Sequence, residues 1–255
     1  MGRRFDPDRA HVLMRKKGAN VKKIWKKLPF GVRSRVHRLL HRFNSSGLFI
    51  RLISFRHLLA VREMKSSSFP VYLRIGESRK FSGWISTNYQ VIARHFLDAT
   101  KPYGSGVCKY VFADNVIEHL DFSAGEKLIE CAWDALVPGG ILRITTPDLD
   151  SIARKYLTGS QEAVTQFAED LVEHDLEIRS APDLLRITFT KFGHEKGFIY
   201  DFQTLENLLK AKGFIEIKRF LPGDSADPNL RNLETRVKPS DSWSQMAVEA
   251  LKPKP

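Results

Sequence analysis

Short hydrophobic runs separated by polar turns predict β-strands through the last three quarters of the chain. The runs predict strands at Phe69–Gly76, Gly83–Asn88, Lys109–Ala113, Ile141–Thr145, Phe214–Phe220 and Ser244–Leu251. Helices are predicted at Ser123–Leu136, Gln161–Ile178 and Phe202–Lys212, with Ser123 and Asp201 as N-caps and Gly213 as the C-terminal stop. Alternation of strands and helices predicts an α/β domain, a doubly wound Rossmann-like sheet with helices on both faces.

The first 67 residues have a different pattern and a different charge. Basic and apolar residues recur at helical spacing in 15–27, 36–43 and 48–61, which predicts amphipathic helices. Residues 1–67 hold 18 Lys and Arg against 3 Asp and Glu, whereas the remainder holds 23 against 26. We therefore expect a basic, largely helical N-terminal extension at 1–67 and a near-neutral domain at 68–255.

Three roles are open for this extension. It can pack over the domain as a solvated helical segment, or it can bind an anionic membrane surface, because its basic residues lie beside Trp, Phe and Leu side chains. Nucleic acid is the third candidate partner, and it ranks last because no recognition motif accompanies the charge.

Composition excludes several classes of protein. A hydrophobic content of 42% and a charged content of 27% fit a globular fold and exclude disorder throughout. Cys108 and Cys131 fit neither a disulfide framework nor a spaced metal site. No apolar run reaches the length of a membrane-spanning helix and the start is not a signal peptide, so a cytoplasmic protein is expected, with peripheral membrane attachment as the alternative.

The residues that follow the predicted strands are the candidates for a ligand site, because ligands of such sheets bind outside the carboxyl ends of the strands. These residues are Gly76-Glu77-Ser78, Asn88, Asp98, Asp114-Asn115 and Thr146-Pro147-Asp148.

Two of these segments carry a family resemblance. Asp114-Asn-Val-Ile-Glu-His-Leu120, a helix, and Leu136-Val-Pro-Gly-Gly-Ile-Leu-Arg-Ile-Thr-Thr-Pro-Asp148 closely resemble class I S-adenosylmethionine-dependent methyltransferases of the type 11 kind. Within that class the chain looks like a branch with a short first helix, often associated with polysaccharide genes. The resemblance covers Pro70 to about Leu251. It implies a seven-stranded, mostly parallel sheet with an antiparallel last strand, and S-adenosyl-L-methionine as the cofactor.

The resemblance also assigns cofactor contacts to Gly76, Glu77, Asn88, Asp98 and Asn115. Two departures alter this set: Ser78 stands where the family's first loop usually has a second glycine, and Asn88 stands where its second strand usually ends in Asp or Glu. A purely structural role remains open for three of these residues. Gly76 can be a turn glycine, Asn88 can end a strand, and Asp98 can be a loop carboxylate.

Acceptor chemistry is expected from two other segments. Glu118 and His119 are neighbours on one helical turn, so their side chains should point in different directions and only one should face a substrate. His119 and His194 are the candidate catalytic bases, and Asp148 and Tyr200 are candidate acceptor-binding residues. No spaced metal motif is present, so no metal is expected. The long loop from Asp224 to Ser242 adds Asp224 and Glu234 as weaker candidates.

These features favour an O-methyltransferase that acts on a sugar, a polysaccharide or a small hydroxylated metabolite. The chain lacks the Asp/Asn-Pro-Pro-aromatic loop of base N-methylation, the Pro-Cys of cytosine methylation and the GxGxxG of dehydrogenases. The first alternative is a catalytically impaired, methyltransferase-like binding or scaffold protein, anchored to a membrane or polyanion by its basic N-terminus. The second is an RNA methyltransferase. No sequence feature indicates an oligomeric state.

Overall fold

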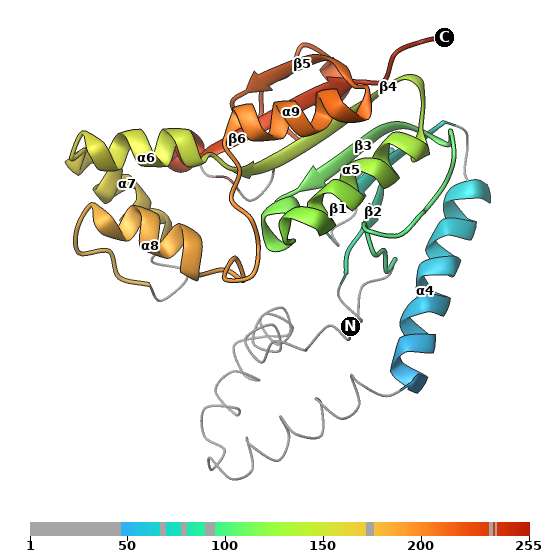
Figure 1. Cartoon of the computed structure of the whole chain (residues 1–255), viewed down its shortest axis with the longest axis horizontal. Helices are drawn as coiled ribbons and strands as arrows, with labels where there is room; N and C mark the ends of the chain where they lie inside the picture. The colour runs from blue at the N-terminus through green and yellow to red at the C-terminus, as the bar shows by residue number, and fades with distance from the viewer. Residues whose placement is uncertain are drawn as a thin grey trace.

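The protein contains a mixed sheet with helices packed beside it (Figure 1). The computed structural model describes residues 47–66, 70–77, 81–89, 95–171, 176–234, 237 and 239–255. Its strands are β1 (Val71–Ile75), β2 (Ile85–Thr87), β3 (Cys108–Asp114), β4 (Leu136–Pro147), β5 (Ile215–Phe220) and β6 (Gln245–Leu251), in the spatial order β2-β1-β3-β4-β6-β5.

Strand directions confirm the predicted fold class. The first four strands run parallel, and β6 is inserted antiparallel between β4 and β5. The described residues form six strands, against the seven expected. Beside β2, a single parallel bridge joins Asn88 to Phe96 without forming a further strand.

One face of the sheet is covered by helices. Here α5 (Phe122–Ala135) and α9 (Phe202–Lys212) pack side by side over the sheet, as Figure 1 shows. Their buried side chains join those of the central strands in the main core, which includes Val111, Ile144 and Val248. Burial of these strands explains why their sequences are nearly continuous apolar runs.

The predicted helix boundaries hold for α9 and shift for α5. The Asp201 carboxylate caps α9 by accepting from Thr204 N at 2.7 Å, and Gly213 ends it with a φ of 107°. For α5 the predicted cap at Ser123 is wrong, because Asp121 is the N-cap and accepts from Ala124 N. An aspartate two residues earlier provides the same cap chemistry.

On the opposite face, the described residues form no helix longer than one turn, so the helices predicted for this face are not seen in the described part of the chain. The segment 221–234 crosses this face, where Leu230 and Leu233 pack on Tyr110 and Phe112. It contains the one-turn helix η3 (Pro228–Leu230). The side chains of the sheet on this face are large, aromatic or charged, and an irregular segment supplies the backbone carbonyls and carboxylates that they need.

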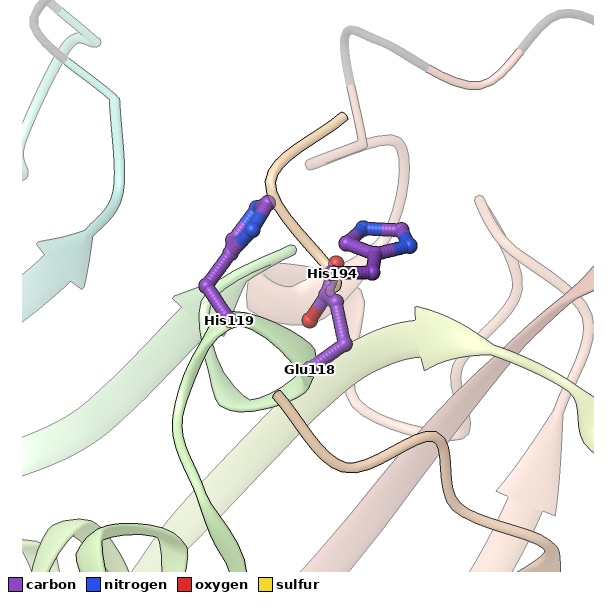
Figure 2. A group of neighbouring side chains, drawn as sticks. All are labelled: Glu118, His119 and His194. Atoms are coloured by element: carbon purple, nitrogen blue, oxygen red, sulfur yellow. The ribbon is translucent and has the colours of Figure 1, made fainter. Parts of the chain in front are cut away.

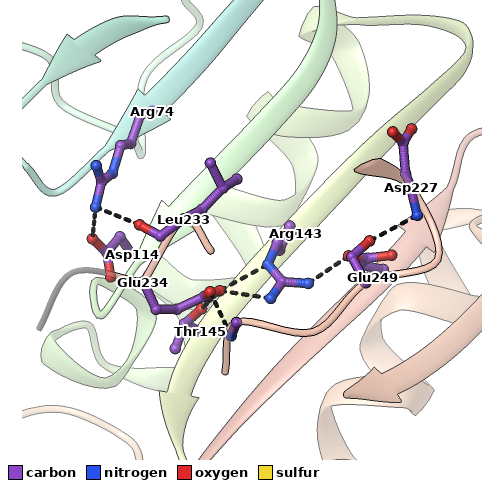
Figure 3. Close-up of polar contacts among 10 residues, drawn as sticks. Arg74, Asp114, Arg143, Thr145, Asp227, Leu233, Glu234 and Glu249 are labelled. Atoms are coloured by element: carbon purple, nitrogen blue, oxygen red, sulfur yellow. Dashed lines mark hydrogen bonds and ion pairs between the residues drawn. The ribbon is translucent and has the colours of Figure 1, made fainter. Parts of the chain in front are cut away.

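Two buried arginines on this face bind such carbonyl and carboxylate partners (Figure 3). Arg74 donates to the Asp114 carboxylate at 2.6 Å and to the carbonyl of Leu233 at 2.9 Å. Arg143 pairs with Glu234 at 2.7 Å and also with Glu249. The expected acceptor-site role of Glu234 is therefore wrong, because its carboxylate binds Arg143 inside the protein.

A group of three helices follows the carboxyl end of β4. It consists of α6 (Leu149–Leu157), α7 (Gln161–Leu171) and α8 (Pro182–Thr190), which with η4 (Pro239–Ser244) enclose a second apolar cluster around Ile152, Phe167 and Ile187. The helix predicted to reach Ile178 ends at Leu171 in the described residues, and α6 and α8 were not predicted.

The extension is described only in its last part. Residues 1–46 lie outside the described residues, and α4 (Gly47–Ser66) continues from there. Ala60 and Met64 of α4 are buried, and Met64 belongs to the main core. No helix among the described residues is long and apolar enough to cross a membrane. The domain boundary near residue 67 and the cytoplasmic location stay predictions.

Candidate functional site

The loops after β1 and β3 meet where the sheet changes its winding direction. Gly76 follows β1 with a φ of 102°, and a Cβ there would lie 2.5 Å from Val116 Cγ2 and 2.6 Å from the carbonyl oxygen of Asp114. No side chain fits at this position without moving the loop after β3. Packing alone therefore requires glycine at position 76, and its contact with a cofactor stays a prediction.

Asn88 connects the ends of two strands. Its side chain is buried, and its Nδ2 donates to the carbonyl oxygen of Gly76 at 2.9 Å. An ionised Asp or Glu could not donate this bond, which gives a physical reason for the amide at this position. Glu77, next to Gly76, is also buried. Cofactor contacts of Asn88 and Glu77 stay predictions.

Asp98 closes a turn of its own loop. Its Oδ1 accepts from the backbone N of Thr100 at 3.1 Å and from Thr100 Oγ1 at 2.7 Å, and the side chain is buried. These bonds match the structural alternative of a loop carboxylate, and the predicted adenine contact is not tested by them.

Asn115 has the features of a ligand-facing residue. It follows β3 in the left-handed region with a φ of 48°, which costs strain for a residue other than glycine. Its Nδ2 donates to Gln245 Oε1 at 2.9 Å, but its Oδ1 is buried and accepts no hydrogen bond within the described part of the chain. A buried acceptor of this kind calls for a ligand or a water as donor.

Three further side chains converge directly after Asn115 (Figure 2). Glu118 and His119 belong to the one-turn helix η1 (Ile117–His119), and His194 comes from the loop that precedes α9. One polar atom of each side chain lies within 4.8 Å of those of the other two, and the two imidazole centroids are 4.8 Å apart. The expectation that Glu118 and His119 face different ways is wrong. A loop from elsewhere in the sequence brings His194 to both of them.

Backbone packing fixes this convergence. Phe198 N donates to the carbonyl of Leu120 at 2.9 Å, which ties the His194 loop to the residue after η1. The backbone of Gly197 packs against the backbone of Glu118. A Cβ at position 197 would overlap the carbonyl oxygen of Glu118 and lie 2.7 Å from its carbonyl carbon. The close approach of two backbones requires glycine here.

His194 is held in one orientation. Its Nδ1 lies 2.7 Å from the carbonyl oxygen of Thr188, and the ring is buried. Burial lowers the pKa of His194, the neighbouring Glu118 carboxylate opposes this effect, and His119 adds to it. Because a carbonyl can only accept, Nδ1 carries the hydrogen and Nε2 of the neutral ring has a lone pair.

The two predicted acceptor-binding residues are engaged in the fold. Asp148 caps α6 by accepting from Ser151 N and pairs with Arg219; burial raises the pKa of its carboxyl, and Arg219 opposes the rise. Tyr200 lies fully buried in the core against Gly125 of α5, and burial raises the pKa of its phenol well above the usual range. The Oη of Tyr200 is buried and makes no hydrogen bond within the described residues, and the acceptor-binding roles of Asp148 and Tyr200 stay predictions.

Comparison with known proteins gives structural similarities only. No protein-family model and no curated protein matches the chain. Similar solved structures include Haemonchus contortus phosphoethanolamine N-methyltransferase 2 in complex with S-adenosyl-L-methionine, at 12% identity and a TM-score of 0.41 over 77% of this chain and 52% of that one. Two S-adenosylmethionine-dependent methyltransferases are also similar, one of Thermotoga maritima (11% identity, TM-score 0.43) and one of Archaeoglobus fulgidus (15% identity, TM-score 0.41). The similarity covers 88% and 81% of this chain, respectively, and the whole of both other chains.

This chain spans about half the length of the phosphoethanolamine methyltransferase, of which it covers 52%. The methyltransferase class rests on the family resemblance of the sequence and stays a prediction. The branch within that class stays a prediction.

Proposed function

We propose that the protein is an S-adenosylmethionine-dependent methyltransferase that methylates a hydroxyl group of a sugar, a polysaccharide or a small metabolite. The observation that carries the proposal is the gathering of Glu118, His119 and His194 immediately after the carboxyl end of β3. Polar side chains that converge at the carboxyl edge of a mainly parallel α/β sheet, beside the point where the strand order reverses, lie where such sheets bind their ligands. The sequence resemblance in Asp114–Leu120 and Leu136–Asp148 supports the same class.

Of the residues predicted to hold the cofactor, Asn115 fits best. Its buried Oδ1 accepts no hydrogen bond from the described residues, so a ligand amino or hydroxyl group can donate to it. When bound, S-adenosyl-L-methionine supplies a methyl group activated by a sulfonium. We propose that His119 or His194 accepts the proton of the acceptor hydroxyl and that the burial of His194 helps to exclude water.

Calorimetric titration with S-adenosylmethionine and S-adenosylhomocysteine tests the cofactor proposal. We expect micromolar binding to the natural chain and about two- to tenfold weaker binding to Asn115→Gly, because one buried hydrogen bond contributes about 0.5–1.5 kcal/mol. Glycine keeps the left-handed backbone at 115, so the change removes only the side chain. Asn232→Gly is the matched control, since Asn232 also has a positive φ of 55° but is exposed.

Two results would count against the proposal. Equal affinities of Asn115→Gly and the natural chain would remove Asn115 from the cofactor site. No binding of either compound to the natural chain would favour the alternative of a binding or scaffold protein, for which the engagement of Asn88 with Gly76 is the structural support.

We further propose that α4 attaches the protein to an anionic membrane surface. Phe55, Leu58 and Leu59 share one side of α4 at helical spacing and are 58%, 63% and 47% exposed. Ala60 and Met64 are buried instead, so α4 has one apolar side toward the protein and one toward solvent. Exposed apolar residues that belong to the basic segment 1–67 of the sequence suit the boundary between headgroups and acyl chains.

Sedimentation with lipid vesicles tests this attachment. We expect binding to vesicles with 30% phosphatidylserine, and at least tenfold weaker binding when Phe55, Leu58 and Leu59 are all replaced by Ser, because inserted apolar side chains contribute about 1.5–3 kcal/mol each. Leu157→Ser, which removes another exposed leucine (79%), is the control. Unchanged vesicle binding by the triple variant would leave α4 out of the interface, and displacement from vesicles by an RNA oligomer would favour the nucleic-acid alternative.

A further inference from the structure

We propose that Glu118, His119 and His194 bind a divalent first-row transition-metal ion of the Zn²⁺ type. The donor set consists of two imidazoles and one carboxylate from two separate segments of the chain, shown together in Figure 2. Two His and one Glu form the protein part of several catalytic zinc sites, which keep a fourth position for water or substrate. Imidazole ligands disfavour Mg²⁺ and Ca²⁺, which prefer oxygen ligands.

The spacing of the donor atoms fits a site without its ion. These atoms lie within 4.8 Å of one another. Tetrahedral zinc with bonds of about 2.0–2.1 Å places neighbouring ligand atoms about 3.4 Å apart. The side chains must therefore close by no more than about 1.4 Å, which changes in their χ angles can provide while the backbone stays fixed.

Orientation of His194 is that of a metal ligand. Its Nδ1 donates to the carbonyl of Thr188 at 2.7 Å, so the lone pair on Nε2 is the one available to an ion. Metal-binding histidines nearly always donate their other ring N–H to a carbonyl or a carboxylate in this way. His119 makes a similar but longer contact, in which its Nδ1 lies 3.5 Å from the carbonyl oxygen of Gly193.

The surroundings favour an ion of double positive charge. Glu118 and His194 are only 1% and 7% exposed. A divalent cation bound by this carboxylate would stabilise its ionised form at a buried position, because metal ligands bind in their deprotonated form. The contact of Gly197 with Glu118 and the bond from Phe198 N to the Leu120 carbonyl hold both ligand segments before any ion arrives. Little ordering is then needed on binding.

A metal ion would change the chemistry of the proposed function, and this consequence rests on that proposal. With both imidazoles as ligands, the acceptor hydroxyl binds at the fourth position and its proton is lost to solvent, because a bound cation lowers the pKa of the hydroxyl. The acceptor oxygen then forms a bond to the methyl carbon while the methyl–sulfur bond breaks. The electron pair of that bond goes to sulfur and neutralises its charge.

Metal titration of the full-length chain without an affinity tag tests the site directly. After dialysis against dipicolinate, Zn²⁺ is titrated by calorimetry and Co²⁺ by visible absorption, with neither cofactor nor acceptor present. We expect submicromolar Zn²⁺ binding and a ligand-field band of Co²⁺ typical of four or five ligands. Glu118→Gln and His194→Asn should each lose one equivalent of tight binding, with affinity at least 100-fold lower at this site. Asn at 194 can still donate to the Thr188 carbonyl, so His194→Asn separates ligand loss from loss of the loop's anchor.

Glu195→Gln is the matched control, because it removes an exposed carboxylate next to His194 and should leave both metals bound as in the natural chain. Retention of the full stoichiometry by Glu118→Gln and His194→Asn, or millimolar binding by the natural chain, would overturn the inference and leave the three residues as a buried polar network. Zn²⁺ binding without S-adenosylmethionine binding would support this site while the methyltransferase proposal fails. S-adenosylmethionine binding without tight Zn²⁺ binding would do the reverse.

Discussion

Gly197→Ala is expected to destabilise the protein by about 3 kcal/mol, since overpacking in a tight contact typically costs 1–3 kcal/mol and occasionally more. The added Cβ would overlap the carbonyl oxygen of Glu118 and lie 3.1 Å from His119 Cα. Both neighbours are backbone, and the bond from Phe198 N to the Leu120 carbonyl prevents an easy shift. The His194 loop must therefore separate from η1, which also disperses the cluster of Glu118, His119 and His194.

Urea unfolding and metal titration measure the two effects of Gly197→Ala. Gly159→Ala is the control: a Cβ there meets nothing within 4 Å, so only its φ of 62° opposes the change, at about 1–2 kcal/mol. A Gly197→Ala variant as stable as the natural chain, with its metal affinity intact, would show that the two backbones are not in contact.

Arg143→Met is expected to lower the free energy of unfolding by about 3–5 kcal/mol, the usual cost of removing one partner of a buried ion pair. Arg143 is fully buried and pairs with the carboxylates of Glu234 and Glu249. Methionine fills much of the same space but leaves both carboxylates inside the protein without their cation. The Glu234 carboxylate also accepts from Gly223 N. If Glu234 moves, this bond is lost and the segment 221–234, which covers the sheet face opposite α5 and α9, becomes less tightly held.

Neutralising the carboxylates distinguishes charge from volume. We expect the triple variant Arg143→Met, Glu234→Gln, Glu249→Gln to recover more than half of the lost stability in urea unfolding, because no uncompensated charge remains buried. Arg154→Met provides the exposed counterpart, since Arg154 pairs with Asp150 at the surface, and should cost less than about 1 kcal/mol. A similar cost for Arg143→Met and Arg154→Met would contradict a buried network.

The order and type of the main elements could be predicted from the sequence because their signals are local. Asp201 and Gly213 delimit α9 through contacts within a few residues, and apolar runs mark the buried strands. The Asp121 cap was missed because Ser123 offers the same chemistry two residues later. Helices α6 and α8 were missed because they are short, and their burial comes from the cluster that they form with each other.

The sequence by itself determined the α/β class and the candidates along the carboxyl edge of the sheet, and the family resemblance implied the antiparallel last strand. Only the tertiary structure decided which candidates meet. It assigned Asn88 to Gly76, Glu234 to Arg143 and Tyr200 to the core, and it brought His194 to Glu118 and His119. These contacts join segments far apart in the chain, and their geometry depends on backbone approach at single glycines such as Gly197. Residue spacing determines local periodicity, but it contains no information on which distant loop packs against which strand end.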